Sequence, residues 1–345
     1  MAASLFLLSW RSNYRENTMI NRRLMLQSAA ALGLLATSAG AAAKSTPVIF
    51  HTDIGGDIDD TWALLLLLRR PELDLRLVVT EGGNAGYRGR LAAKLLTLAG
   101  RANVPLAIGP DGHDDKAAQS EWIGDFTLKD YAGPIRNGGA QAIVETIMAS
   151  PEPVTLITVG PATTAAEALT IEPAIAGKAR FVGMAGSVRV GYGAGKPPEA
   201  EYNVKTDPAA WRAVFAAPWL SCSITPLDTC GFIVFDGEQY QALRRSHDPF
   251  ARAIIANSEA WAPSAFWMPK DFDVTRQSST QFDSVAVTMA YDESNLVMET
   301  LPLSVTDDGM TIIDEKNGHP VRVATQWRDM ARFKQRMLES LTGGR

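Results

Sequence analysis

The sequence predicts an α/β fold: a single Rossmann-like domain in which a mostly parallel sheet carries helices on both faces. Three observations support this prediction. From residue 46 onward, short β-branched runs alternate with helical patterns, as in chains of β-α-β units. The helical patterns place apolar residues at i, i+3 and i+4, which is typical of helices that cover a sheet. No linker separates two domains, so residues 46–345 are expected to form one domain.

The predicted elements follow one another in a regular order. Strands are predicted at 48–52, 75–80, 104–108, 154–159, 179–184 and 223–226. Helices are predicted at 59–70, 86–99, 140–149 and 163–169. The leucine run at 64–68 is too short to span a bilayer, and it is interpreted as a buried part of the first helix. Ligands of open parallel sheets bind beyond the carboxyl ends of the strands, so the active site is expected at that edge.

Three long stretches interrupt the alternation of strands and helices. Residues 110–139, 189–201 and 258–280 are rich in Gly, Pro or Trp. Loops of this length inside a compact domain are usually functional or disordered. The second of them follows a predicted strand, as does the acidic segment described below, so loops of different chemistry are expected to meet at one edge of the sheet.

The composition is that of a globular protein. The 345 residues are 46% hydrophobic and include 28 Gly and 19 Pro. The net charge of −5 and the absence of a long basic run give no support for nucleic-acid binding. Cys222 and Cys230 could form a disulfide or remain as two free thiols, and neither has the spacing of a metal-binding pair.

Residues 1–43 have the features of an N-terminal extension followed by a twin-arginine-like signal peptide. Arg22 and Arg23 precede an apolar, alanine-rich stretch that ends in three alanines before Lys44. Initiation at Met19 would place the arginine pair near the start of the chain. We therefore expect a periplasmic or secreted bacterial protein whose mature N-terminus lies at or near Lys44, with no stable membrane association after cleavage.

The acidic segment HTDIGGDIDD, residues 51–60, directly follows the first predicted strand. Its four aspartates repel one another unless a cation lies among them or water surrounds them. One or two would suit the first turn of the following helix, so a solvated acidic turn is the alternative to a metal site. A group of carboxylates favours Ca²⁺ or Mg²⁺ over zinc, which prefers His and Cys ligands. A phosphatase of the haloacid dehalogenase type would need a nucleophilic aspartate where this chain has His51.

This segment resembles the signature of the inosine-uridine preferring nucleoside hydrolases, which cleave N-ribosidic bonds using Ca²⁺. It matches the longer form of the family's aspartate motif, and the match continues into Ala63 and Leu64. Four further matches occur in the family's order: Gly83-Asn84, Val159-Gly160-Pro161, Glu201-Tyr202-Asn203 and Phe282-Asp283. Together the five matches cover roughly residues 46 to 295.

The resemblance implies a metal site and a general base. Asp53, Asp60 and Asp283 would bind Ca²⁺ with their carboxylates, and Val159 would add its backbone carbonyl. Asp53 would also remove a proton from the Ca²⁺-bound water. An N-riboside departs through an oxocarbenium-like transition state, whose positive charge clustered carboxylates stabilise.

The resemblance also implies a set of ribose-binding residues. Asp59, Asn84, Glu201 and Asn203 match positions that hold the ribose hydroxyls. The 2′- and 3′-hydroxyls can complete a shell of seven or eight oxygens around Ca²⁺. Asp57 belongs to the longer loop, and it could take the role assigned to Asp59.

Two positions depart from the family pattern. His51 replaces the first aspartate, which supports the metal loop, and Phe282 stands where many members have a histidine that protonates the leaving base. Purine-preferring members have an aromatic residue there. Phe282 is therefore expected to bind a purine by stacking, with Trp122, Trp261 or Trp267 either on the other face of the base or in ordinary packing.

The other histidines offer few alternative proton donors. His113 lies on the polar 110–139 loop and could reach the site from there. His247 lies in a charged helical segment and His319 in a turn, so both are expected at the surface.

These observations predict an N-glycosyl hydrolase that releases ribose and free base from ribonucleosides, with Ca²⁺ as cofactor. Purine nucleosides are slightly favoured, which would suit purine salvage. The alternatives are a ribohydrolase acting on another ribosylated base or derivative, and a non-catalytic, metal-dependent nucleoside- or ribose-binding protein. The expected partner is a small nucleoside, and the family's habit of forming dimers and tetramers is the only guide to homo-oligomerisation.

Overall fold

The computed structural model describes residues 45–111, 117–193 and 195–344. The predicted signal peptide, its cleavage site and His113 lie outside the described residues. None of the described helices is long and apolar enough to cross a membrane. Cys222 and Cys230 are free thiols, so the disulfide alternative is not adopted.

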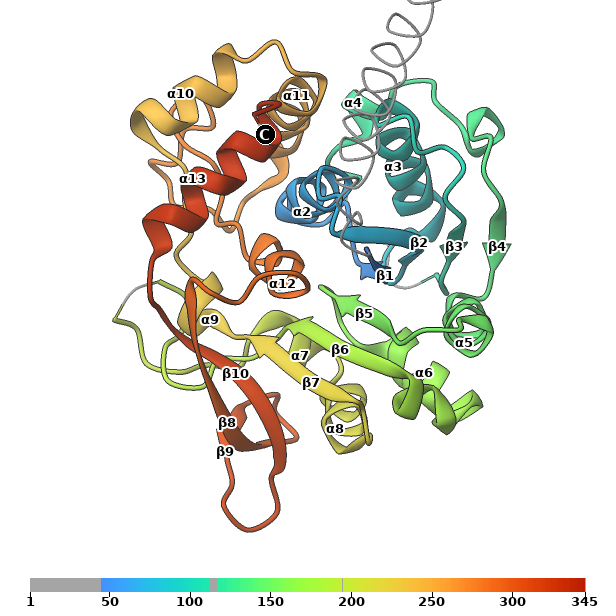
Figure 1. Cartoon of the computed structure of the whole chain (residues 1–345). Helices are drawn as coiled ribbons and strands as arrows, with labels where there is room; N and C mark the ends of the chain where they lie inside the picture. Colours follow the sequence, from blue (N-terminus) through green and yellow to red (C-terminus); the bar gives the residue numbers. More distant parts are fainter. Residues whose placement is uncertain (1–44, 112–116, 194, 345) are drawn as a thin grey trace, which may run out of the picture. The chain divides into compact units, whose positions relative to one another are not determined.

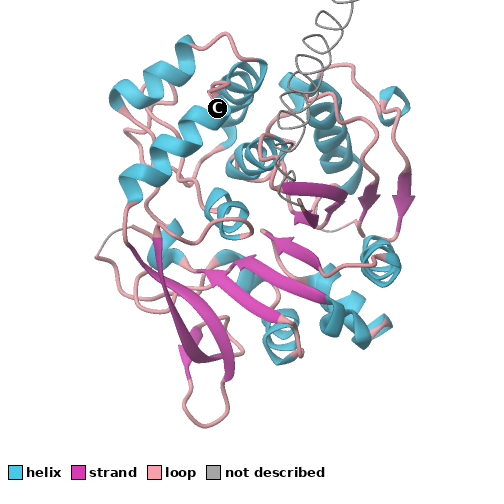
Figure 2. Ribbon diagram, in the orientation of Figure 1, coloured by secondary structure: helices cyan, strands magenta, loops and turns pink. Residues whose placement is uncertain are grey.

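A ten-stranded sheet forms the centre of residues 45–344, in the order β4-β3-β2-β1-β5-β6-β7-β10-β8-β9 (Figures 1 and 2). All neighbours from β4 to β10 in this order pair in parallel, whereas β8 and β9 pair in antiparallel fashion. The predicted, mostly parallel sheet is therefore confirmed. The strands are β1 (Thr46–Thr52), β2 (Leu73–Thr80), β3 (Leu106–Ile108), β4 (Ile135–Asn137), β5 (Val154–Thr158), β6 (Ala179–Met184), β7 (Ser221–Thr225), β8 (Leu296–Val305), β9 (Thr311–Ile313) and β10 (His319–Trp327).

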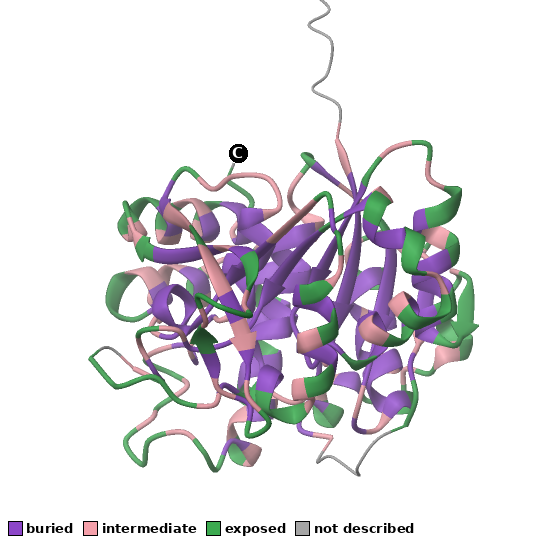
Figure 3. Ribbon diagram, turned by 90° about the horizontal axis from the view of Figure 1, so that it is seen from below, coloured by how far each residue is buried: buried purple, intermediate pink, exposed green. Residues whose placement is uncertain are grey.

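Helices cover both faces of this sheet, as predicted. Val48 and Phe50 of β1 pack in one apolar cluster and Ile49 in the other, because alternate residues of a strand point to opposite faces. Figure 3 shows the strands buried between these layers. The helices are α2 (Asp59–Leu68), α3 (Ala85–Leu98), α4 (Ser120–Ile123), α5 (Gly139–Ala149), α6 (Thr163–Ile171), α7 (Tyr202–Thr206), α8 (Pro208–Ala216), α9 (Leu227–Cys230), α10 (Gly237–Arg245), α11 (Pro249–Trp261), α12 (Asp283–Met289) and α13 (Met330–Leu341), with short 3₁₀ turns at Leu128–Asp130, Pro173–Lys178 and Ala262–Ser264.

Each predicted strand and helix begins and ends within two residues of the corresponding element in the structure. The leucine run lies in α2, which is buried on all sides as far as Leu67. Its all-round burial follows from its position between the sheet and the helices α11, α12 and α13.

Four strands were not predicted. The edge strand β4 has three exposed residues, so it carries no apolar pattern. In β8 and β10, Pro302 and Pro320 lie opposite each other, and proline interrupts the residue pattern by which strands are identified. With β9, these two strands extend the sheet beyond β7 as an antiparallel addition.

Candidate active site and metal centre

The site lies where the direction of the sheet's connections reverses. The chain runs from β1 outward to β2 on one side, whereas β5, the other neighbour of β1, leads to β6 on the opposite side. Loops after β1 and β5 diverge at such a point and leave a crevice. Asp53 and Gly160 meet there, because a Cβ on Gly160 would lie 2.9 Å from an Asp53 carboxylate oxygen. The glycine therefore permits a close approach that a side chain would prevent.

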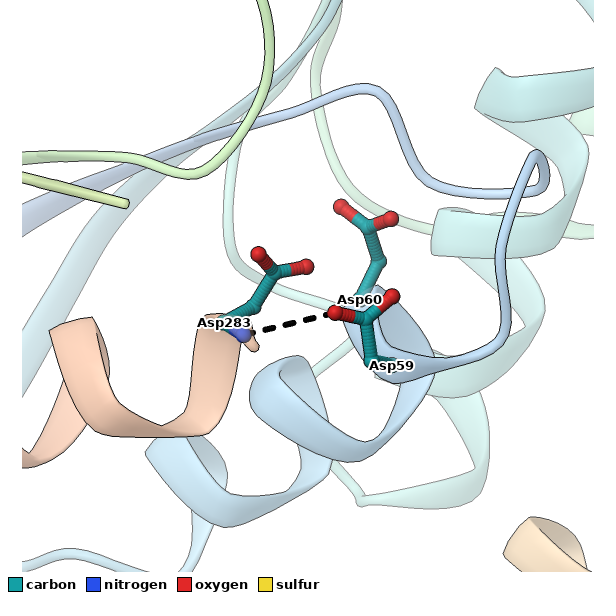
Figure 4. Close-up of side chains that lie close together, drawn as sticks. All are labelled: Asp59, Asp60 and Asp283. Carbon is teal, nitrogen blue, oxygen red and sulfur yellow. Dashed lines mark hydrogen bonds between the residues drawn. The ribbon is translucent and has the colours of Figure 1, made fainter. Parts of the chain in front are cut away.

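Three aspartates from two distant segments come together beside this point. Asp59 and Asp60 project from the start of α2, and Asp283 projects from the start of α12 (Figure 4). One carboxylate oxygen of each lies within 4.8 Å of those of the other two, and all three residues are buried. The backbone N–H of Asp283 donates to Asp59 Oδ2 at 3.3 Å, and the Thr52 hydroxyl donates to Asp60.

The chemistry of this group fits a hard divalent cation. Burial raises the pKa of all three carboxyl groups well above 3.8, and repulsion from the neighbouring carboxylates raises it further. Ionised carboxylates this close together need a compensating charge, and an all-oxygen donor set is the kind that Ca²⁺ and Mg²⁺ prefer. Asp59, Asp60 and Asp283 therefore could hold a metal ion.

Asp53 acts on this group through its charge, and Val159 directly precedes Gly160, the glycine next to Asp53. Among the described residues, Asp53 is not one of the three clustered carboxylates, although its negative charge contributes to the raised pKa of each of them. Burial raises the pKa of Asp53 to about 6, against the attraction of the Arg88 guanidinium, which lowers it. The Val159 carbonyl accepts a hydrogen bond from the Asn203 amide at 3.3 Å. The assignment of Asp53 and Val159 as metal ligands remains a prediction.

Glu201 and Asn203 are held next to the Val159 carbonyl by the short helix α7. The Glu201 carboxylate accepts the N–H groups of Gly186 (2.9 Å), Asn203 (2.8 Å) and Val204 (3.2 Å). Burial raises its pKa to about 7, although these three donors lower it. The Asn203 amide also donates to the Met184 carbonyl at 3.1 Å. Both side chains are thus fixed by backbone groups, as residues that position a substrate must be.

Asn84 has a structural partner of its own. Its side chain caps α3 by accepting the Tyr87 N–H at 2.9 Å, and it is half-buried. The carbonyl oxygen is therefore committed to the helix, whereas its amide N–H groups remain the donors that the predicted ribose contact would use.

The aromatic residues considered for base binding differ in burial and in the residues that they contact. Phe282 packs edge-on against Tyr192, with ring centroids 5.9 Å apart. Trp261 is fully buried and donates to the Gly56 carbonyl, and Trp122 packs against Lys94. Of the three tryptophans considered as a second face for the base, only Trp267 has a large exposed fraction, 48%.

Tyr192 was not anticipated, because it lies in a glycine-rich loop without helical or strand periodicity. Its hydroxyl accepts the Tyr202 N–H at 2.9 Å, which joins this loop to the segment that carries Glu201.

Two buried charged residues near Asp53 were also missed. Arg88 of α3 donates to the Ile54 carbonyl at 3.0 Å, and its sequence signal is a cation within the apolar stripe of a helix. Glu81 follows β2, accepts the Thr164 N–H at 2.9 Å and lies 2.9 Å from His51 Nε2. His51 thus contacts the end of β2 and, through Thr158, β5. His247 and His319 are exposed, as predicted.

Sequence comparison identifies the family. The profile of the family described as inosine-uridine preferring nucleoside hydrolase matches residues 48–335. The chain belongs to this family. The solved structures of this family's fold include a plant nucleoside hydrolase, PpNRh1 (TM-score 0.72, 21% identity, covering 87% of this chain and 99% of that one), and a purine-preferring ribonucleoside hydrolase from Gardnerella vaginalis (TM-score 0.70, 20% identity, covering 86% and 98%). At these identities the likeness concerns the fold.

Curated relatives match over a shorter region. The chain is 32% identical over 180 residues to the pyrimidine-specific ribonucleoside hydrolase RihA of Citrobacter koseri, covering 49% of this chain and 56% of the relative. It is 34% identical over 179 residues to the non-specific ribonucleoside hydrolase RihC of Escherichia fergusonii, covering 49% and 57%. The alignments thus span little more than half the length of these two nucleoside hydrolases.

Metal binding to this protein should depend on pH. The pKa of Asp53 is raised from 3.8 to about 6, so the folded metal-free protein binds more protons than the unfolded chain between these values. Its stability therefore falls as the pH rises through this window. Ca²⁺ binds the ionised carboxylates, so it should raise the melting temperature more at pH 7 than at pH 5. At a free concentration of 100 Kd the gain is about 2.7 kcal/mol.

Differential scanning calorimetry with Ca²⁺ or chelator measures this effect. Asp283→Asn should abolish it, whereas Asp248→Asn, which changes a helix cap bonded to Arg69, should preserve it. Identical melting curves with and without chelator at pH 7 would contradict the metal site.

Arg88→Met should destabilise the metal-free protein more than the Ca²⁺-loaded protein. The substitution removes the donor to Ile54 and a cation that lowers the pKa of Asp53 and Asp60. Loss of a hydrogen bond to a charged group costs about 1.5–3 kcal/mol, and bound Ca²⁺ should offset the electrostatic part. Urea unfolding with and without chelator measures it, with Arg76→Met at an exposed site as control. If Arg88→Met lowers the free energy of unfolding equally with and without chelator, Arg88 contributes only through its hydrogen bond and not through its charge.

Proposed function

We propose that the protein hydrolyses the N-glycosidic bond of ribonucleosides and releases ribose and the free base. The observation that carries this proposal is the buried group of Asp59, Asp60 and Asp283 beside Asp53, at the carboxyl ends of the paired strands β1 and β5. Family membership and the names of the curated relatives support the same activity.

Different residues of the chain would act as general base, bind the ribose and stabilise the transition state of this reaction. Asp53 is the general base: its carboxylate accepts a proton from the attacking water, whose oxygen bonds to the ribose C1′ while the electron pair of the broken bond passes to the base. Glu201 and Asn203 hold ribose hydroxyls, and the clustered carboxylates stabilise the positive charge that develops on the sugar. A Ca²⁺ ion bound by these carboxylates would orient water and lower its pKa.

Purine nucleosides are the proposed preference among neutral substrates. Phe282 is half-buried directly before Asp283, and its ring forms a T-shaped pair with that of Tyr192, so an aromatic pair adjoins the clustered carboxylates. A stacked purine offers more surface than a pyrimidine and can accept a proton at N7. The names of the curated relatives include a pyrimidine-specific and a non-specific enzyme, so substrate choice has to be measured directly.

Asp53→Asn should lower turnover by roughly 10² to 10⁴ with every nucleoside, because the base that accepts the water's proton is lost. The measurement is release of ribose from inosine, adenosine, uridine and cytidine by the Ca²⁺-loaded protein. Asp271→Asn, at an exposed position, is the matched control. A protein that binds nucleosides but releases no ribose would be a binding protein, and the proposed function would be wrong.

Phe282→Ala should act selectively on purine nucleosides. An aromatic contact adds about 0.5 to 1.5 kcal/mol beyond its buried area, so the loss for inosine relative to uridine should be about tenfold. A nitrophenyl riboside, whose leaving group needs no proton, should be affected least. The values of kcat/KM for the three substrates test this. An equal loss for all three would show that stacking on Phe282 does not activate the base.

A further inference from the structure

Side chains hold the glycine-rich turn of the acidic loop by its backbone. Three successive carbonyls each accept a hydrogen bond: Ile54 from Arg88 (3.0 Å), Gly55 from the Tyr87 hydroxyl (3.1 Å) and Gly56 from the Trp261 indole (3.2 Å). Gly55 has a φ of +104°, and a Cβ there would lie 2.6 Å from the Tyr87 ring. Three side chains thus hold the backbone of the turn that immediately precedes Asp57.

Asp57 is the remaining carboxylate of this loop, and its hydrogen-bond partners among residues 45–344 that the structure describes are N–H donors. Its Oδ1 accepts the Ile58 N–H at 2.6 Å, and the Trp267 side chain donates a second hydrogen bond. Two carboxylate oxygens can accept about four hydrogen bonds, so Asp57 retains capacity for a ligand. It is partly exposed, and among the described residues it is not one of the three clustered aspartates.

An open aromatic surface adjoins Asp57. Trp267 is 48% exposed, and its ring lies edge-on to the buried Trp261 at 5.9 Å. Phe266, which is 81% exposed, lies edge-on to Trp267 at 5.2 Å. Because Trp261 also anchors the Gly56 carbonyl, the aromatic residues and the acidic loop form one connected unit. Exposed aromatic side chains next to a carboxylate are suited to a planar cationic ring.

The charge of the site favours such a ligand. Five carboxylates, on Asp53, Asp57, Asp59, Asp60 and Asp283, act on one another, and Arg88 is a cation that acts on Asp53 and Asp60. One guanidinium and one divalent ion supply three positive charges against the five negative charges of these ionised aspartates, and Glu81 and Glu201 add negative charge beside Asp53. A positively charged substrate reduces this repulsion, and a neutral one does not.

The described residues also contain no imidazole near Asp57 that could protonate a departing base. His51 contacts Glu81 and Thr158, and His247 and His319 are exposed. A base attached through a quaternary nitrogen needs no proton, because the electron pair of the broken bond neutralises its ring.

We propose that Asp57 and Trp267 are specificity-determining residues that favour ribosides with a positively charged base, of the N-ribosylpyridinium class. The proposal rests on the proposed hydrolase function and names a substrate class for the same site. Asp57 attracts the charge of the ring while Trp267 contacts it. Because the positive charge moves from the base to the ribose during cleavage, Asp57 acts mainly on the binding of the substrate, and its loss should raise KM more than it lowers kcat.

The experiment compares nicotinamide riboside, which carries a pyridinium ring, with uridine, which is neutral. The quantity measured is the ratio of their KM values in each variant of the Ca²⁺-loaded protein. Asp57→Asn keeps the shape of the side chain and removes its charge. The KM for nicotinamide riboside divided by the KM for uridine should therefore rise about tenfold. Trp267→Leu should raise it in the same direction. Asp271→Asn removes one charge from an exposed position of the neighbouring segment, and the ratio should change less than twofold.

The outcomes separate this proposal from the proposed function. If uridine is hydrolysed and the ratio is the same in Asp57→Asn and Asp271→Asn, the specificity proposal is overturned and the hydrolase function stands. If neither substrate releases ribose, the hydrolase function fails, and calorimetric titration with N-methylnicotinamide decides the specificity question. Tenfold weaker binding to Asp57→Asn than to the parent protein supports the proposal, whereas equal binding or none overturns it.

Discussion

Repulsion between buried carboxylates is the constraint on which the rest of the site depends. Asp59, Asp60 and Asp283 are buried with their oxygens within 4.8 Å of one another, and the nearby Asp53 raises the pKa of all three. Such an arrangement is unfavourable in the absence of a cation, since each ionised carboxylate has lost water and gained a like-charged neighbour. Their location at the first turns of α2 and α12 helps, because helix N-termini favour negative charge.

The surrounding structure holds these groups in place against that repulsion. Thr52 links backbone and site, because its hydroxyl accepts the Ile54 N–H at 3.1 Å and donates to Asp60. Donors from α3 and α11 fix the next three carbonyls, and Gly160 lets the β5 loop approach Asp53. The contacts made by α3, α11 and Gly160 join the acidic loop to elements that are distant in the sequence. The loop is therefore held by side chains of other elements, although it has no regular structure itself.

This explains which parts of the structure could be predicted. The β-α-β order, both helix layers and the buried leucine run follow from local patterns, and they are confirmed. Asp60 and Asp283 could be proposed as neighbours because the family resemblance assigns both to one metal site. Sequence could not tell that Asp59, instead of Asp53, would be the third clustered carboxylate. That choice depends on the conformation of the loop, which Tyr87 and Trp261 determine from other elements.

The missed residues have a common physical reason. Arg88, Glu81 and Tyr192 have no motif. Arg88 and Glu81 matter because they are buried beside the carboxylates, and Tyr192 because its hydroxyl accepts the N–H of Tyr202 at the start of α7. A departing base has to accept an electron pair, and three devices help it to do so: protonation, stacking on an aromatic ring, or a positive charge that it already carries. The described residues supply aromatic rings at Phe282 and Trp267 and an excess of negative charge, but no imidazole beside them. The proposed preference for bases that stack well or that are already cationic therefore rests on two features of the described residues, the excess of carboxylates and the absence of an imidazole beside them.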